Sequence, residues 1–362
     1  MTGPIPKSGI MDIAAYVPGR AKLAGVERPL KLSANENPFG CSEAARAAFL
    51  AAASELNLYP DANTSRLRGA IAERFKLEPE RLVFGAGSDE IFTFAAQAYL
   101  GPGDNAVQPQ YGFAAWAIAV AATGARMKSA PEPGFVADVD EILAAVDENT
   151  RIVFVANPAN PTGTWLPFSE IERLHTGLPA RVLLVLDGAY AECAIGIEGF
   201  SEGLDWSRDK ENVLVTRTFS KAYGLASLRI GWAYGSSSVV SALDRIRLPF
   251  SVPRAGEAAA VAALDDDAFV RRSVAAFDQG RRELDAALRD KGLRTLPSAT
   301  NFVTARFDDA KAADATFAQH GILVRHLANY GMPDWLRISI GTPDDIKRVI
   351  AVLQQVHPAK AP

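Results

Sequence analysis

The chain has 362 residues, of which 48% are hydrophobic and 22% charged, and its formal net charge is −4. This composition is typical of a globular protein, and the length suits one large domain with a smaller one. The slightly acidic balance offers no basic surface, so nucleic acid is not expected as a partner. No run of about 18 apolar residues predicts a membrane span.

The cysteines and histidines give no sign of a disulfide framework or a metal site. Cys41 and Cys193 are the two cysteines, and they do not form a Cys-x-x-Cys pair. The four histidines lack the spacing of zinc-binding motifs. The first residues are interrupted by proline and glycine and contain no apolar signal core. We therefore expect a cytoplasmic protein without a bound metal.

Helices and short apolar strands alternate along the first two thirds of the chain. Helices are expected over residues 41–56 and 64–75, with Thr64 or Ser65 as the cap of the second. Strands are then expected over residues 81–85, 105–109, 125–130, 151–158, 181–190, 212–219 and 229–235, most of them separated by helices. Because these strands are apolar on both faces, the pattern predicts an α/β fold with a mostly parallel sheet that is covered on both sides.

The pattern changes from about residue 255. A long helical run over residues 254–292, with room for one break, is followed by short strands over 300–307, 322–327 and 335–341. These segments predict a smaller α+β domain that packs closely against the first. We expect a ligand site in the cleft between the two.

The segment VFGAGSDE, residues 83–90, joins a strand to a helix. Gly85 and Gly87 allow a tight turn, and Ser88 and Asp89 can cap the helix. Free amides at a helix N-terminus bind anions, so a phosphate could lie there, although an ordinary strand-to-helix loop explains the motif equally well. Glu90 stands where a dinucleotide-binding fingerprint needs a third glycine, which argues against a nicotinamide cofactor.

Two further loops place polar side chains at the ends of apolar strands. In VANPANPTG, residues 155–163, two Asn-Pro pairs end the strand and present Asn160 at its carboxyl end, unless they form only a two-proline turn. In LLVLDGAY, residues 183–190, Asp187 ends a very apolar strand. A buried carboxylate there needs a cationic partner, unless it caps the next element.

Lys221 lies within a mostly apolar segment, RTFSKAYGLASLRIG, residues 217–231. A buried lysine is costly unless it is paired or used, although a surface lysine at the start of a helix explains this segment taken alone. A lysine, a carboxylate, an anion cradle and an asparagine at the strand ends of one sheet together suit pyridoxal phosphate. That cofactor needs a lysine for its Schiff base, an aspartate for its ring nitrogen and an anchor for its phosphate. Ser220 and Arg229 are candidates for the anchor.

One competing motif is present. GFSEG, residues 199–203, matches the Gly-x-Ser-x-Gly pattern of serine hydrolases at Ser201. That pattern needs a strand before it and a helix after it, and the flanking sequences favour neither. We interpret the match as chance.

Nine segments together resemble the fold-type I aminotransferases, and specifically the histidinol-phosphate aminotransferase family, in order and spacing over nearly the whole chain. They are LSANENPFG, LYPD, GSDE, NPANPTG, LDGAYAE, RTFSKAYGLASLRIGW, NFV, ILVR and LRISIGT. The resemblance implies a large domain, residues 41–250, that binds pyridoxal phosphate, and a small domain, residues 251–362. Residues 1–40 would form an N-terminal segment that packs with the small domain. It also implies a homodimer with its sites at the subunit interface.

The resemblance also implies a role for each residue that matches a family motif. Lys221 is similar to the Schiff-base lysine and proton carrier, and Asp187 to the partner of the ring nitrogen. The donors to the cofactor's 3′-oxygen would be Asn160 and Tyr190, and Tyr111 would stack on the ring. The phosphate ligands would be Gly87, Ser88, the backbone amide of Asp89, Ser220 and Arg229, with Tyr59 reaching across the dimer. The substrate contacts would be Tyr16, Asn35, Arg325 and Arg337.

The implied reaction is a ping-pong transamination in histidine biosynthesis. It converts histidinol phosphate and 2-oxoglutarate to imidazole acetol phosphate and glutamate. An aromatic aminotransferase is the alternative on the same scaffold, and more distant ones are a pyridoxal phosphate lyase or decarboxylase and a non-catalytic cofactor-binding protein. The sequence departs from the family at Gly188, where an acidic residue or alanine is usual, and in PFSVPR, residues 249–254, where Asn-Val-Asn usually follows Pro-Phe. The second departure bears on substrate identity.

Overall fold

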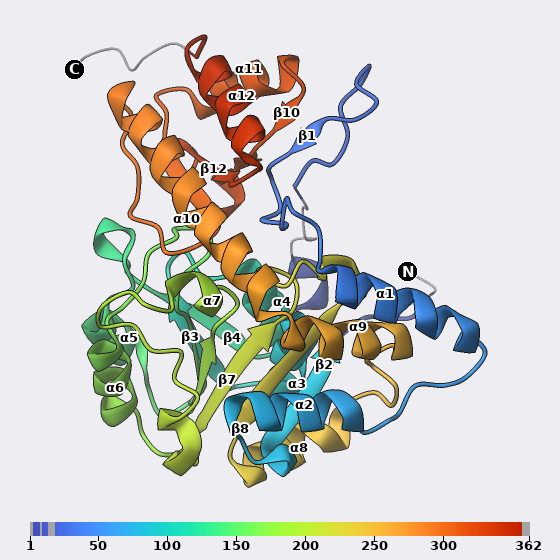
Figure 1. The fold of residues 1–362 in the computed structure, drawn as a ribbon. Coiled ribbons are helices and arrows are strands. Elements are labelled where there is room, and N and C mark those ends of the chain that lie inside the picture. The colour runs from blue at the N-terminus through green and yellow to red at the C-terminus, as the bar shows by residue number, and fades with distance from the viewer. Residues whose placement is uncertain (1–2, 8, 14–18, 357–362) are drawn as a thin grey trace.

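The computed structural model describes residues 3–7, 9–13 and 19–356 (Figure 1). Its central element is a seven-stranded sheet in the order β2-β8-β7-β6-β5-β3-β4. Only β8 runs antiparallel to its neighbours, so the expected mostly parallel sheet is confirmed. The strands are β2 (Leu82–Ala86), β3 (Asn105–Pro109), β4 (Arg126–Ala130), β5 (Thr150–Ala156), β6 (Leu183–Asp187), β7 (Val213–Thr218) and β8 (Ile230–Gly235).

Helices cover both faces of this sheet because alternate strand residues point to opposite sides. Ile152 and Phe154 of β5 pack with α3 (Ser88–Tyr99), α4 (Ala114–Ala121) and α8 (Ser237–Ile246). Val153 and Val155 face the other side, which is covered by α2 (Ser65–Phe75), α5 (Val139–Ala145), α6 (Phe168–Gly177) and α9 (Arg254–Asp265). Helix α1 (Glu43–Ala52) lies against α9. Within the described residues, no helix is both long and apolar enough to cross a lipid bilayer.

The C-terminal part of the chain builds a second core. An antiparallel sheet of β11 (Arg325–His326), β12 (Trp335–Ser339) and β9 (Phe302–Arg306) packs with α10 (Asp267–Asp290), α11 (Ala310–Gln319) and α12 (Pro343–Leu353). The strand expected over 322–327 divides into β10 (Ile322–Leu323) and β11, which belong to different sheets. Turns of 3-10 helix occur at Ile10–Asp12, Ala53–Glu55, Pro79–Arg81, Pro133–Phe135, Trp206–Asp209, Ala226–Leu228 and Ala328–Tyr330.

The N-terminal segment belongs to this second core by its contacts. β1 (Leu30–Lys31) pairs in parallel with β10, and Leu32 is part of the second hydrophobic core, so β1 lies beside the C-terminal elements (Figure 1). Helix α10 connects the two bodies: α9, just before it, contributes Ala259 and Ala260 to the first core, while α10 itself contributes Phe277 to the second. The domain limits at residues 40 and 250 stay predictions.

One of two helix starts agrees with the sequence expectation, and the other differs from it. The long helical run does break once, at Asp266, whose side chain accepts a hydrogen bond from the Phe269 amide and caps α10. At α2, however, the expected cap is wrong, because the Thr64 side chain makes no cap hydrogen bond. Glu257 of α9 instead accepts from the amides of Arg66 and Leu67, at 3.1 and 3.2 Å. A carboxylate from a distant helix thus satisfies the first turn of α2.

Candidate active site

The polar loops identified in the sequence meet at one edge of the large sheet. Strands β2, β5, β6 and β7 run in the same direction, so their carboxyl ends lie together, and β8 begins at that edge because it runs the other way. A cavity of about 450 Å³ lies there. Most of the predicted site residues line it, namely Asn35, Ser88, Asp89, Asn160, Asp187, Tyr190, Ser220, Lys221, Arg229, Arg325 and Arg337.

One end of the cavity is formed by the start of α3 and by Arg229. The Arg229 guanidinium donates to Ser220 Oγ at 3.2 Å and to Asp89 Oδ2 at 3.1 Å. It lies so close to Gly87 that a Cβ added there would be 2.3 Å from Arg229 Nη2. Gly87 also has a φ of +83°, which favours glycine. Glycine is therefore required at this position both by the backbone and by the guanidinium packed against it.

The start of α3 is capped differently from the sequence expectation. Neither Ser88 nor Asp89 caps the helix, since no side chain accepts a cap hydrogen bond there. Glu90 Oε2 instead accepts from the Ala86 amide at 2.7 Å and fixes the preceding turn. The first amides of α3 therefore remain available to a ligand, beside the Ser88 and Ser220 hydroxyls and the Arg229 guanidinium. This arrangement suits a phosphate.

Asp187 lies at the end of β6, in the middle of the sheet, and is 5% exposed. Its Oδ1 accepts from Thr216 Oγ1 at 3.0 Å and from the Ala189 amide at 3.2 Å. Burial raises the pKa of this carboxyl to about 7, although both hydrogen bonds oppose the rise. A cationic ligand group placed against Asp187 would hold it ionised, which is what a pyridinium nitrogen would supply.

Lys221 and Tyr190 lie close to one another in the lining of the cavity. Lys221 Nζ is 5.6 Å from the centre of the Tyr190 ring and 3.5 Å from the Ala34 carbonyl oxygen. Burial, with a further contribution from the positive charge of Arg337, lowers the pKa of Lys221 to about 8. The amine is therefore partly neutral near physiological pH and can act as a nucleophile or carry a proton.

Two buried arginines from the small sheet also line the cavity. Arg325 and Arg337 occupy directly opposite positions on β11 and β12, and both are buried. Arg337 donates to Asn160 Oδ1 and, at 3.0 Å, to the Ser33 carbonyl oxygen. With its oxygen engaged by Arg337, Asn160 has its amide nitrogen to offer a ligand. Two buried like charges on facing strand positions repel one another, so an anion bound between them would be favourable.

Two tyrosines of the predicted site, Tyr59 and Tyr111, are not among the described residues that line this cavity. The Tyr111 ring is stacked on Phe135, with centroids 5.1 Å apart, and Phe113 lines the cavity from the same loop. Tyr59 is 77% exposed and stacked on Phe250. Tyr16 lies outside the described residues. The stacking role of Tyr111 and the phosphate role of Tyr59 stay predictions.

Sequence reasoning missed several residues that line the cavity. They are Lys31, Ser33, Glu36, Phe113, Thr218 and Tyr330. Two of these had a usable signal: Thr218 ends a strand two residues before Ser220, and Phe113 follows Tyr111 at a spacing of two. Tyr330 lies in a turn of 3-10 helix after β11, and only the tertiary fold brings it to the cavity.

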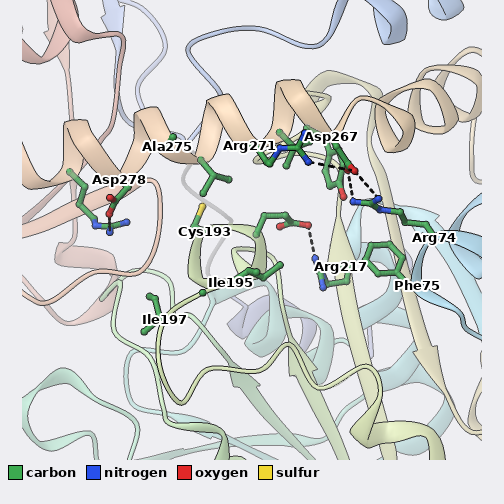
Figure 2. Close-up of a pocket in the computed structure, with 16 residues that line it drawn as sticks. Arg74, Phe75, Cys193, Ile195, Ile197, Arg217, Asp267, Arg271, Ala275 and Asp278 are labelled. Carbon is green, nitrogen blue, oxygen red and sulfur yellow. Dashed lines mark hydrogen bonds and ion pairs between the residues drawn. The ribbon is translucent and has the colours of Figure 1, made fainter.

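A second cavity, of about 630 Å³, lies on the other side of β7, between α7 (Ala191–Ala194) and α10 (Figure 2). None of the predicted site residues lines it. Its buried Arg217 donates to Glu192 at 2.7 Å and to Glu202 at 3.2 Å. A Cβ at Gly188 would lie 3.0 Å from the Arg217 Cδ, so the family departure at Gly188 accommodates this arginine. Because its charges are paired within the protein, this cavity is a poor candidate for the active site.

The serine hydrolase pattern has no catalytic setting. Ser201 lies in the loop between α7 and the turn Trp206–Asp209, with neither a strand before it nor an α-helix after it. Its Oγ accepts from the Gly203 amide at 3.2 Å, which closes a local turn. The interpretation as a chance match therefore agrees with the structure.

The sequence matches the family model for aminotransferases of class I and II over residues 27–353. Histidinol-phosphate aminotransferase 1 of Caulobacter vibrioides is 49% identical over 356 residues, 97% of this chain and 99% of the relative. The histidinol-phosphate aminotransferase of Maricaulis maris is 44% identical and covers 96% of this chain and 97% of the relative. The crystal structure of the Sinorhizobium meliloti enzyme of the same name, in complex with pyridoxal-5′-phosphate, superposes with a TM-score of 0.89, 31% identity and 98% coverage of both chains.

We predict that Gly87→Ala weakens phosphate binding while the protein stays folded. The added methyl group would displace the Arg229 guanidinium, so the dissociation constant for inorganic phosphate, measured by calorimetry on the apoprotein, should rise at least about tenfold. Gly292→Ala is the matched control, because Gly292 has a φ of +82° and no atom within 4 Å of its added Cβ. Equal phosphate affinity in the two variants would show that Arg229 does not depend on Gly87.

The lowered pKa of Lys221 predicts a pH-dependent effect on stability. Between pH 8 and 10.5 Lys221 is protonated in the unfolded chain and neutral in the folded chain. Its unfavourable contribution to the free energy of folding is therefore largest below pH 8 and decreases as the pH rises towards 10.5. Apoprotein with Lys221→Met should therefore be more stable than the parent at pH 7, by a margin that shrinks towards pH 10. Denaturant unfolding between pH 7 and 10 measures this difference in the free energy of unfolding. Lys311→Met serves as the control, because Lys311 is exposed. A margin that is independent of pH would contradict the assigned pKa.

Proposed function

The chain belongs to the class I and II aminotransferases, and we propose that it transfers the amino group of histidinol phosphate to 2-oxoglutarate, with pyridoxal phosphate as cofactor. The products are imidazole acetol phosphate and glutamate. Relatives that match the chain over nearly its whole length carry the name of this activity. The structural observation that carries the substrate assignment is the pair Arg325 and Arg337, which face one another across β11 and β12 in the same cavity as Lys221.

The described residues fit the cofactor at each of its functional groups. The start of α3, Ser220 and Arg229 suit its phosphate, Asp187 its ring nitrogen, and Asn160 and Tyr190 its 3′-oxygen. When bound, the cofactor supplies an electron-accepting ring that stabilises negative charge on the carbon bearing the amino group. Asp187, buried and held by Thr216, keeps a proton on the ring nitrogen.

The protein's own groups perform the proton transfers and the binding. The Lys221 amine, whose pKa is lowered by burial, would hold the cofactor covalently and could carry a proton across one face of the site. Tyr190 and Asn160 hold the ring in place. The arginines bind the anionic end of each substrate in turn, because a guanidinium can make paired hydrogen bonds to phosphate or carboxylate.

The two arginines favour histidinol phosphate over an aromatic amino acid. A phosphate group is close to a dianion at neutral pH and has three terminal oxygens, so it can engage both guanidinium groups at once. The α-carboxylate of phenylalanine or tyrosine is a monoanion that one arginine can satisfy.

Exposed apolar groups around Tyr59 support a homodimer. Leu56, Leu58, Tyr59, Leu248 and Phe250 are all exposed in the single chain. Tyr59 is stacked on Phe250, and Arg254 donates to the Tyr59 carbonyl oxygen, so the loop before α2 and the PFSVPR segment form one surface. A second copy would cover this surface and receive Tyr59 at its phosphate site. The PFSVPR departure would then lie near the partner's substrate.

The free Cys41 and Cys193 suit a cytoplasmic enzyme.

A half-reaction screen tests the proposal. Cofactor-loaded protein is mixed with histidinol phosphate, glutamate, phenylalanine, tyrosine or aspartate, one at a time, and the visible absorbance of the cofactor is followed. We expect rapid conversion by histidinol phosphate and glutamate, and slower conversion by the aromatic amino acids. Faster conversion by phenylalanine or tyrosine than by histidinol phosphate would favour the aromatic aminotransferase. A cofactor band that no amino donor changes would favour a non-catalytic binding protein.

We predict that mixed dimers of two impaired variants, Lys221→Ala and Tyr59→Ala, are more active than either variant alone if Tyr59 contacts the cofactor phosphate in the partner's site. Lys221→Ala lacks the reacting amine, and Tyr59→Ala lacks the phosphate contact given to the partner. After unfolding together and refolding, mixed dimers contain one site with both groups, and about a quarter of all sites should be intact in an equal mixture. Steady-state turnover measures the recovery. Activity no greater than the sum of the separate variants would place Tyr59 in its own chain's site or in none.

A further inference from the structure

Asn35 lies where the N-terminal segment, the second core and the active site meet. Its backbone amide donates to Ser339 Oγ at 2.9 Å, and its carbonyl oxygen accepts from Asn301 Nδ2 at 3.0 Å. Its side chain spans Ser339 and Tyr190: Oδ1 accepts from Ser339 Oγ at 2.8 Å, and Nδ2 donates to the Tyr190 hydroxyl at 2.8 Å. All four of these residues are buried. Asn35 is therefore held by β12 and by the start of β9, and it contacts the tyrosine beside Lys221.

The orientation of the Asn35 amide decides where the Tyr190 proton points. A serine hydroxyl has one proton, and Ser339 Oγ accepts from the Asn35 backbone amide while donating to Oδ1. This places Nδ2 toward Tyr190. The Tyr190 oxygen then accepts a hydrogen bond, and its own proton is left for another acceptor. With the amide turned round, Oδ1 would face Tyr190 and take that proton instead.

We propose that Ser339 is a positioning residue that acts through Asn35, fixing the amide so that Tyr190 receives one hydrogen bond and keeps its own proton for the cofactor's 3′-oxygen. This inference rests on the proposed function, since it needs a cofactor oxygen in front of Tyr190. Strand β12 would then contribute two residues to the site, Arg337 at the cavity and Ser339 behind Asn35. The second core thereby sets a hydrogen bond at the cofactor through a buried path of two side chains.

Two features of the site support this role. The Asn35 backbone has a φ of +57°, which asparagine tolerates better than most residues, so the asparagine fits its backbone as well as its partners. The charged and titratable groups acting on Tyr190 are Arg337, Asp187, Cys193 and Lys221. Ser339 is neutral, and its replacement leaves these charges in place. An effect of Ser339 on the cofactor therefore comes through hydrogen bonding.

The test is a pH titration of the visible absorbance of cofactor-loaded Ser339→Ala. If the freed Asn35 amide turns and takes the Tyr190 proton, the cofactor's 3′-oxygen loses a donor that stabilises its anionic form. The midpoint of the absorbance change should then rise by about half a pH unit or more. Ser207→Ala is the matched control, because Ser207 is also buried, its hydroxyl donates to the Leu204 carbonyl oxygen at 2.8 Å, and it does not line the cavity. Its midpoint should equal that of the parent.

A second variant separates action through Asn35 from a general loosening of β12. Asn35→Gly suits the left-handed backbone and removes the side chain that takes the proton, so adding it to Ser339→Ala should return the midpoint toward the parent value. The proposal is overturned if Ser339→Ala and Ser207→Ala share the parent midpoint, or if the double variant shifts as far as Ser339→Ala alone. Failure of the proposed function would look different, because the parent itself would then bind pyridoxal phosphate without a titratable band.

Discussion

The structure is organised around one unfavourable group, the carboxylate of Asp187 in the centre of a sheet. It ends the apolar strand β6, and in the protein alone two hydrogen bonds, from Thr216 and the Ala189 amide, compensate for its burial. A buried carboxylate is stabilised best by a cation, and in the proposed function the cofactor's ring nitrogen would supply it. Because binding to the folded state alone shifts the folding equilibrium, the cofactor stabilises the fold as well as enabling the reaction.

The remaining groups of the site are distributed over both bodies of the molecule. The anion cradle, Asp187 and Lys221 come from the large sheet, whereas Arg325, Arg337 and Ser339 come from the small one. The N-terminal segment connects them, since Asn35 contacts Tyr190 on one side and Ser339 on the other. In the proposed function, the groups that would hold the cofactor therefore come mostly from the large sheet, and the arginines that would meet the substrate's anion come from the small one. A movement between the cores would also be felt at the large sheet, because Arg337 donates to Asn160 and Asn35 donates to Tyr190.

Local patterns in the sequence predicted much of this arrangement. Strand β3 occupies the expected residues 105–109, because an apolar strand buried on both faces has a clear sequence pattern. The loops carrying Asn160, Asp187 and Lys221 also fall at one edge as expected, since parallel strands share their carboxyl ends. The cap of α2 could not be predicted, because Glu257 is 190 residues from Leu67 in sequence. Tyr111 and Phe113 share one loop, and only the packing of Tyr111 on Phe135 decides which of them lines the cavity.

The pairing of β1 with β10 has a consequence for the order in which the protein is made. Asn35 is 304 residues from its partner Ser339, so the N-terminal segment emerges from the ribosome long before the strands that bind it exist. During synthesis the large sheet can form first, while residues 30–35 have no docking surface until the last strands are complete. Residues 30–35 are thus synthesised before the strands that hold them and are placed only after those strands form. A chain interrupted before β12 would contain Tyr190 and Asn35 but lack Ser339, the residue that holds the Asn35 side chain from the other side.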